Sequence, residues 1–87
     1  MRTVHKYKIH LANDHTVCLL PPEACVVRFA GQHGELFMWA ELDTTATAQG
    51  RRFQVIGTGH EVPGGAVHRG SCAMGEALVW HLYELPG

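Results

Sequence analysis

Short segments of alternating apolar and polar residues recur along this chain at intervals of about ten residues, separated by turn-forming residues. In residues 4–11 the side chains at 7, 9 and 11 are apolar, whereas those at 6, 8 and 10 are lysine or histidine. This period of two is typical of a strand with one buried face. The same reasoning predicts strands over residues 16–20, 24–30, 36–42, 51–56, 66–73 and 77–85. We therefore expect an all-β fold of about six or seven short antiparallel strands, in a small sandwich or a partly open barrel.

Turn residues indicate how these strands connect. Asn13-Asp14 predicts a hairpin between the first two strands, and Pro21-Pro22 ends the second, because proline cannot donate to a strand ladder. Gly31-Gln32-His33-Gly34 predicts a second hairpin, and residues 43–50 are expected to form a loop or a short helical turn. The strands from Leu36 and from Ala77 are apolar on both faces. Each is therefore expected to lie between two layers or against another subunit.

The chain has 87 residues, which is enough for one core, so we expect a single β domain over residues 1–87. Charged residues make up only 17% of it and hydrophobic residues 46%. So little charge is expected to leave apolar surface uncovered. We therefore expect the protein to associate with itself as a homo-oligomer.

The formal net charge of −1 argues against direct nucleic-acid binding, which needs a strongly basic surface. No run is apolar enough for a signal peptide or a membrane span, so we expect a cytoplasmic protein that does not contact membranes. Three cysteines, Cys18, Cys25 and Cys72, are odd in number and lack C-x-x-C spacing. They are expected to be small, buried hydrophobic residues, with neither a disulfide framework nor a zinc ribbon.

The most distinctive local feature is the loop Gly57-Thr58-Gly59-His60, which follows a predicted strand that begins with Arg51 and Arg52. Successive backbone N–H groups in a glycine turn can converge on an anion, and the threonine, histidine and arginines would add donors. We predict a ligand-binding site from these six residues. The alternative is a tight turn with no ligand, since no helix follows as in known phosphate-binding fingerprints.

The remaining reactive residues give weaker signals. Seven histidines lack metal-ligand spacing, so no metal or other cofactor is expected, although distant strands could bring some together with Glu61 or Cys72. Ser71 lies near His68, but strand alternation argues against a nucleophile and base there. The histidines are His5, His10, His15, His33, His60, His68 and His81. Four aromatic residues are expected in the core rather than in a stacking platform: Phe37, Trp39, Trp80 and Tyr83.

The segment from Phe53 to Pro63, which contains the glycine loop, resembles a family of small proteins of unknown function that is common in bacteriophage and prophage genomes. Similar family features are a Lys6-Tyr7 pair in the opening strand and a turn like Pro21-Pro22-Glu23-Ala24. A Leu-x-x-Trp-Ala strand, here residues 36–40, and a closing strand, here residues 77–81, complete the pattern. The resemblance implies a phage origin and a β fold, with the cytoplasm of a host bacterium as the place of action.

These observations predict a non-enzymatic phage accessory protein that acts by stoichiometric binding. The most specific form of this prediction is a role in counter-defence, in which a homo-oligomer sequesters an anionic small molecule or a nucleotide. Two alternatives remain open. One is a protein-interaction module that blocks a host defence complex through an apolar face, and the other is a small hydrolase that uses His60 and Glu61.

Overall fold

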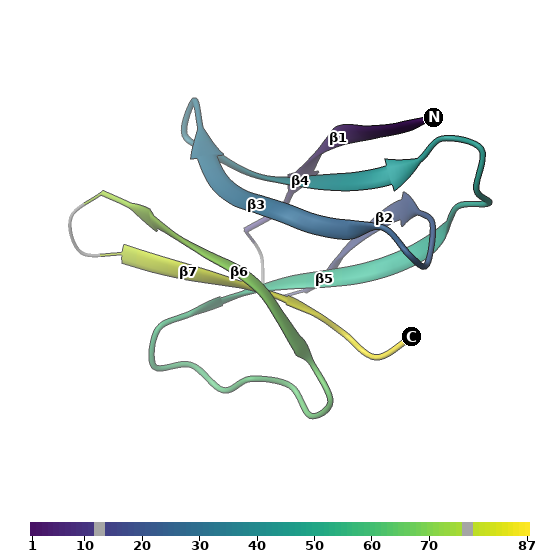
Figure 1. Ribbon diagram of the computed structural model, residues 1–87. Coiled ribbons are helices and arrows are strands. Elements are labelled where there is room, and N and C mark those ends of the chain that lie inside the picture. The colour runs from purple at the N-terminus through teal and green to yellow at the C-terminus, as the bar shows by residue number, and fades with distance from the viewer. Residues whose placement is uncertain (12–13, 76–77) are drawn as a thin grey trace.

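The computed structural model describes residues 1–11, 14–75 and 78–87, and it confirms an all-β sandwich (Figure 1). Two antiparallel sheets face each other, in the strand orders β1-β4-β3 (sheet I) and β2-β5-β7-β6 (sheet II). The strands are β1 (Arg2–Ile9), β2 (Thr16–Leu20), β3 (Cys25–Gln32), β4 (Glu35–Asp43), β5 (Gln49–Gly57), β6 (Val67–Met74) and β7 (Leu78–Glu84). No helix capable of spanning a membrane occurs in these three ranges.

The predicted hairpin between the first two strands is wrong, because β1 and β2 lie in different sheets. β1 pairs with β4 and β2 pairs with β5. Ile9 on β1 and Leu20 on β2 are both buried, so placing the strands in opposite sheets lets their apolar faces share one core. Of the turn expected between them, Asn13 lies outside the described residues.

The core is built from the inward faces of the central strands. On β4, Met38 and Ala40 are fully buried, and they face Phe53 of β5 and Leu82 of β7 in one continuous cluster. The other face of β4 carries Phe37 and Trp39, which are half-buried. The apolar character of both faces of β4 therefore reflects its central place in sheet I.

Basic side chains cover the two outward aromatic rings of β4. The Lys6 ammonium lies 4.1 Å from the centre of the Phe37 ring, and the Arg28 guanidinium lies 5.5 Å from that of Trp39. These distances allow cation–π attraction, and the long side chains shield apolar surface from water. Phe37 and Trp39 thus lie outside the core in which the sequence placed them.

The sheets approach each other closely where β3 faces β6. A Cβ atom placed on Gly70 would lie 3.0 Å from Cβ of Phe29, so only glycine fits at this contact without displacement. A β-bulge interrupts β6 between His68 and Gly70, opposite β7. β6 pairs antiparallel with β7, and Ala77, the residue predicted to begin the last strand, lies outside the described residues.

Candidate functional site

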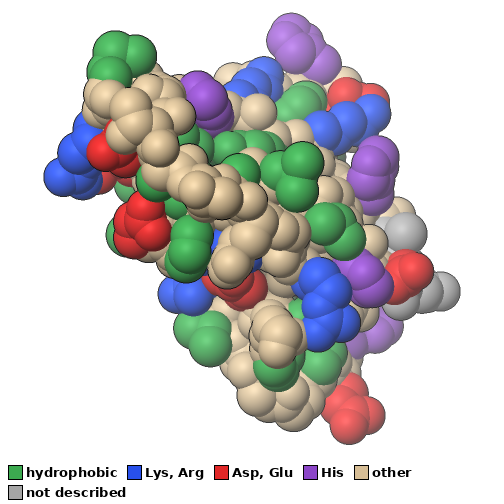
Figure 2. Space-filling view, turned by 90° about the vertical axis from the view of Figure 1, so that its right-hand side faces the viewer, with side chains coloured by type: hydrophobic (Ala, Val, Ile, Leu, Met, Phe, Trp, Pro, Cys, Tyr) green, Lys and Arg blue, Asp and Glu red, His purple; other side chains and the backbone are tan. Residues whose placement is uncertain are grey.

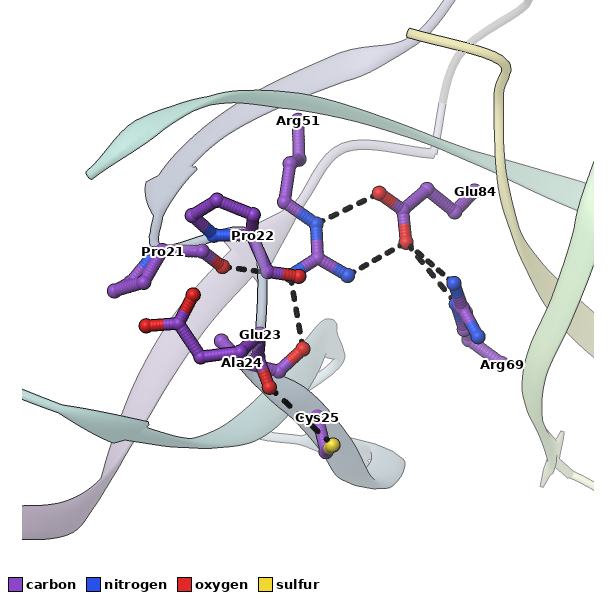
Figure 3. A network of polar contacts seen from close by, with 8 residues as sticks. All are labelled: Pro21, Pro22, Glu23, Ala24, Cys25, Arg51, Arg69 and Glu84. Atoms are coloured by element: carbon purple, nitrogen blue, oxygen red, sulfur yellow. Dashed lines mark hydrogen bonds and ion pairs between the residues drawn. The ribbon is translucent and has the colours of Figure 1, made fainter. Parts of the chain in front are cut away.

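Arg51, the first predicted ligand-binding residue, lies on the inner face of β5 and is 8% exposed (Figure 3). Its Nη1 donates hydrogen bonds to the carbonyl oxygens of Pro21 at 2.9 Å and Ala24 at 2.8 Å. Its Nε and Nη2 donate to the two carboxylate oxygens of Glu84, each at 2.7 Å. The guanidinium therefore joins the β2–β3 connection to β5 and to the end of β7.

Two arginines share the one carboxylate of this cluster. Arg69, on β6, adds a second cation 3.0 Å from the Glu84 carboxylate. The hydrogen bonds from Arg51, together with its positive charge and that of Arg69, lower the pKa of Glu84 despite partial burial. The hydrogen bonds to Glu84 likewise raise the pKa of Arg51. Arg51 is held within the fold by these contacts, whereas a ligand-binding arginine needs free N–H groups.

Arg52 points the other way, because successive side chains of a strand alternate between its faces. It lies on the outer face of sheet II, where its guanidinium donates to the carbonyl oxygen of Pro86. Gln54 follows on the same face and pairs in register with Tyr83 of β7. The structure therefore separates the two predicted arginines and leaves only Arg52 beside solvent-facing polar groups.

The glycine loop makes a tight turn directly after β5. The backbone N–H of His60 donates to the carbonyl of Gly57 at 3.1 Å, and Gly59 has a φ of +89°, a conformation that favours glycine. A Cβ on Gly57 would lie 3.1 Å from the Trp80 ring. These contacts account for both glycines as turn residues.

The same loop also borders a hollow with a volume of about 370 Å³. Gly57, His60 and Glu61 line it, together with Trp80 and Leu11. The pairing of β2 with β5 ends at Phe53, so β2 does not cover the last residues of β5 here. His60 and Glu61 therefore lie beside an indole and an aliphatic side chain.

Thr58 takes part in a chain of side-chain hydrogen bonds that crosses the outer face of sheet II. Its Oγ1 lies 2.9 Å from Nε2 of His81 on β7. The other ring nitrogen of His81, Nδ1, lies 2.7 Å from Oγ of Ser71 on β6. That oxygen in turn lies 2.9 Å from Nε2 of His68. One loop residue from the predicted site is thus joined to three residues that were not predicted to bind a ligand.

The β-bulge at Arg69 explains why this chain of residues was missed. In a regular strand His68 and Ser71, three positions apart, would lie on opposite faces. The bulge inserts one extra residue, after which His68 pairs with Tyr83 and Ser71 with His81 on the same outer face. The expectation that alternation separates His68 from Ser71 is therefore wrong. In the sequence, Gly70, which follows Arg69 within the predicted strand, was the signal that indicated a bulge.

The hydrogen bonds fit one consistent direction of donation. Thr58 Oγ1 also lies 3.3 Å from the carbonyl oxygen of Val79, to which it can only donate. Nε2–H of His81 then donates to Thr58, and its Nδ1 accepts from the Ser71 hydroxyl, which accepts from Nε2–H of His68. Each of the four side chains thus has a hydrogen-bond partner within the chain.

The electrostatic character of this face favours anions. No carboxylate from β5, β6 or β7 points outward there, since Glu84, the one acidic residue of these three strands, is bound to Arg51. Arg52 can donate to an anion, and the two imidazoles and the hydroxyls of Thr58 and Ser71 could do so by exchanging the hydrogen bonds that they make with one another. Tyr83 adds an aromatic ring, packed edgewise against His68 at 5.3 Å between ring centres.

Other predicted groups lie apart from this face. Cys72 pairs with Trp80, and both contact the core from the inner side of sheet II. Burial raises the pKa of the Cys72 thiol. Within the described ranges, no three histidine, cysteine or acidic side chains come close enough to share a metal ion. The histidines brought together are His68 and His81, with ring centres 6.3 Å apart.

Comparison with known proteins gives a family but no characterised relative. The search of curated proteins found no match, and the search of solved structures found none either. The scan against protein families found a match that extends over residues 1–87, to the family described as "Domain of unknown function (DUF7352)". The chain therefore belongs to the DUF7352 family.

Proposed function

We propose that this protein is a non-enzymatic binding protein whose outer face of sheet II takes a small anionic ligand, a nucleotide in the most specific version. The observation that carries the proposal is the hydrogen-bonded chain Thr58–His81–Ser71–His68, which lies on a face with no outward carboxylate from β5, β6 or β7. The proposed ligand-binding residues are Arg52 and Thr58, from the sequence analysis, together with His68, Ser71 and His81.

The dimensions of this face suit a ligand larger than a single phosphate. Arg52 lies opposite Leu85, four residues along β7 from His81, which corresponds to about 13 Å at a rise of 3.3 Å per residue. Arg52 would bind one anionic group and His81 a second group at the other end. Tyr83 lies between them on the same face and offers a ring to a base.

The biological setting is part of the proposal. The resemblance to phage proteins, together with stoichiometric binding, suggests counter-defence in the host cytoplasm, in which the protein lowers the free concentration of a nucleotide signal. A homo-oligomer would present several copies of this face. Sequestration needs affinity and copy number rather than turnover.

Calorimetry against a panel of nucleotides and cyclic nucleotides tests the proposal. Arg52→Ala and His81→Ala are each expected to weaken binding by about 1.5–3 kcal/mol, the usual scale for a charge-assisted hydrogen bond. Arg28→Ala, on sheet I, is the matched control and is expected to bind like the parent. The proposal fails if no panel member binds, or if both variants bind a ligand as tightly as the parent.

A second candidate, a module that blocks a host protein complex, is supported by the exposed edge of sheet II. Val17 and Leu19 point outward from β2, with 56% and 68% of their surfaces exposed. β2 is an edge strand and carries no charged side chain, so its edge lacks the usual protection against pairing with another chain. Loss of partner capture in Leu19→Lys, with nucleotide binding absent throughout, would favour this candidate.

A further inference from the structure

We propose that His68 and His81 form a binding site for a divalent transition metal ion of the zinc and nickel class. The proposal goes beyond the anion-binding function, because it requires no anionic ligand and does not involve Arg52. It rests on the convergence of two ring nitrogens from neighbouring strands on one point at the protein surface.

The shared point is the hydroxyl oxygen of Ser71. Nε2 of His68 lies 2.9 Å from this oxygen, and Nδ1 of His81 lies 2.7 Å from it. A zinc ion binds imidazole nitrogen at about 2.0–2.1 Å. An ion next to the Ser71 hydroxyl would bind both nitrogens once the two side chains rotate to that distance.

His81 is already oriented for metal binding, whereas His68, whose Nε2–H donates to Ser71, must carry its proton on Nδ1 instead to bind an ion. Histidines that bind metals usually donate their second N–H to a neighbouring group, which fixes the tautomer and directs the free lone pair at the ion. His81 has such a partner: its Nε2 faces Thr58 Oγ1, which is anchored on the Val79 carbonyl. His68 is held by the edge of the Tyr83 ring.

The ligand set selects the class of metal. Imidazole suits zinc, nickel and copper, whereas magnesium and calcium require carboxylate and carbonyl oxygens. Two imidazoles, with Ser71 Oγ as a neighbouring oxygen, leave further coordination positions for water or for an anion. The strand pairing that positions Ser71 opposite His81 holds the site on a sheet rather than on a loop.

Nickel titration by calorimetry, after treatment with a chelator, tests this site on the intact protein. Nickel avoids the preference of zinc for the free thiols of Cys25 and Cys72. We expect one saturable site per chain, with the affinity reduced at least tenfold in His68→Ala and in His81→Ala.

Matched controls separate this site from other nitrogen ligands. His10→Ala removes an exposed histidine from the end of β1 and is expected to leave nickel affinity unchanged. His68→Gln, with circular dichroism of each variant, shows whether a loss of binding reflects lost folding. The proposal is overturned if nickel does not bind saturably, or if folded His68 and His81 variants bind it as the parent does. Nucleotide titrations with chelator present test the anion-binding function separately, so either proposal can fail alone.

Discussion

The guanidinium of Arg51 and the carboxylate of Glu84 form a two-pronged ion pair, in which Nε–Oε2 and Nη2–Oε1 both measure 2.7 Å. This pair lies where β5 and β7 meet the chain crossing from β2 in sheet II to β3 in sheet I (Figure 3). The remaining guanidinium nitrogen binds carbonyl oxygens of that crossing. One side chain therefore links both sheets of the sandwich.

Replacing Arg51 is expected to destabilise the fold strongly. Arg51→Ala removes the forked contact to Glu84, which keeps only its contact with Arg69, and the donor to the Ala24 carbonyl. Removing one partner of a buried ion pair costs about 3–5 kcal/mol. Arg51→Lys keeps the charge but cannot reproduce the forked contact, so it should recover only part of the loss. Urea unfolding measures both, with Arg52→Ala as the neighbouring control. A loss for Arg51→Ala no larger than that for Arg52→Ala would contradict this assignment.

The ion pair also predicts how stability depends on pH. The pKa of Glu84 is lowered in the folded protein from an ordinary value of 4.5, so its contribution is fully present above that value. The contribution is lost as pH falls through the folded pKa. Urea midpoints measured from pH 6 down to pH 3 should therefore fall, and the fall should be shallower in Glu84→Gln. Some dependence on pH should remain in Glu84→Gln, because the pKa of Asp43 is also lowered, to about 2, mainly by a hydrogen bond from the Thr45 backbone N–H. Equal slopes in parent and variant would be inconsistent with this role.

The sequence predicted the strands well because a period of two is a local signal, and all seven occur close to their predicted bounds. It did not predict which strands pair, since that depends on contacts between distant segments. The turn residues between the first two strands predicted a hairpin. In the structure these strands lie in opposite sheets, and Ile9 and Leu20 face one core from the two sides.

The candidate site was predicted only in part. Alternation alone places Arg51 and Arg52 on opposite faces, and this information was available from the sequence. The pairing of His68 with Ser71 was not, because it depends on a bulge whose position is set by the approach of Gly70 to Phe29 across the sandwich.

The three cysteines are expected to react at different rates with a thiol reagent at neutral pH. Cys25 is exposed, whereas Cys18 is buried and its burial raises the thiol pKa to about 11. The thiolate is the reactive form, so Cys18 should remain unmodified until the protein unfolds. Cys72 should be intermediate, because partial burial raises its pKa as well. Mass spectrometry of a time course, with a urea-unfolded sample for comparison, identifies each site, and early modification of Cys18 would be unexpected.

Substitution of Gly57 and of Gly59 by alanine is expected to destabilise the fold for different physical reasons. Gly59→Ala forces a side chain into a positive φ and should cost about 1 kcal/mol, with open space around the new methyl group. Gly57→Ala keeps an ordinary φ but brings its methyl group against Trp80 and His60. It should therefore change the tryptophan fluorescence of the folded protein as well as the urea midpoint. Fluorescence that changes equally in both variants would contradict this distinction.

Self-association is expected to depend on the outer side of β2. Exposed apolar side chains occur elsewhere as well: on the end of the molecule in Figure 2 they lie between charged ones. β2 differs because Val17 and Leu19 point outward from an uncharged edge strand. Two copies can pair such strands antiparallel about a twofold axis, which joins two four-stranded sheets into one.

Light scattering at micromolar concentration should therefore show at least a dimer for the parent protein. Leu19→Lys places a charge on the pairing edge and should shift the mass towards the 9.6 kDa of one chain, with an unchanged circular dichroism spectrum. Val62→Lys changes an exposed valine in the loop after β5 and serves as the control, because it should not alter the mass. A parent that is already monomeric, or a Leu19→Lys variant that stays as large as the parent, would show that the edge of β2 is not where two copies meet.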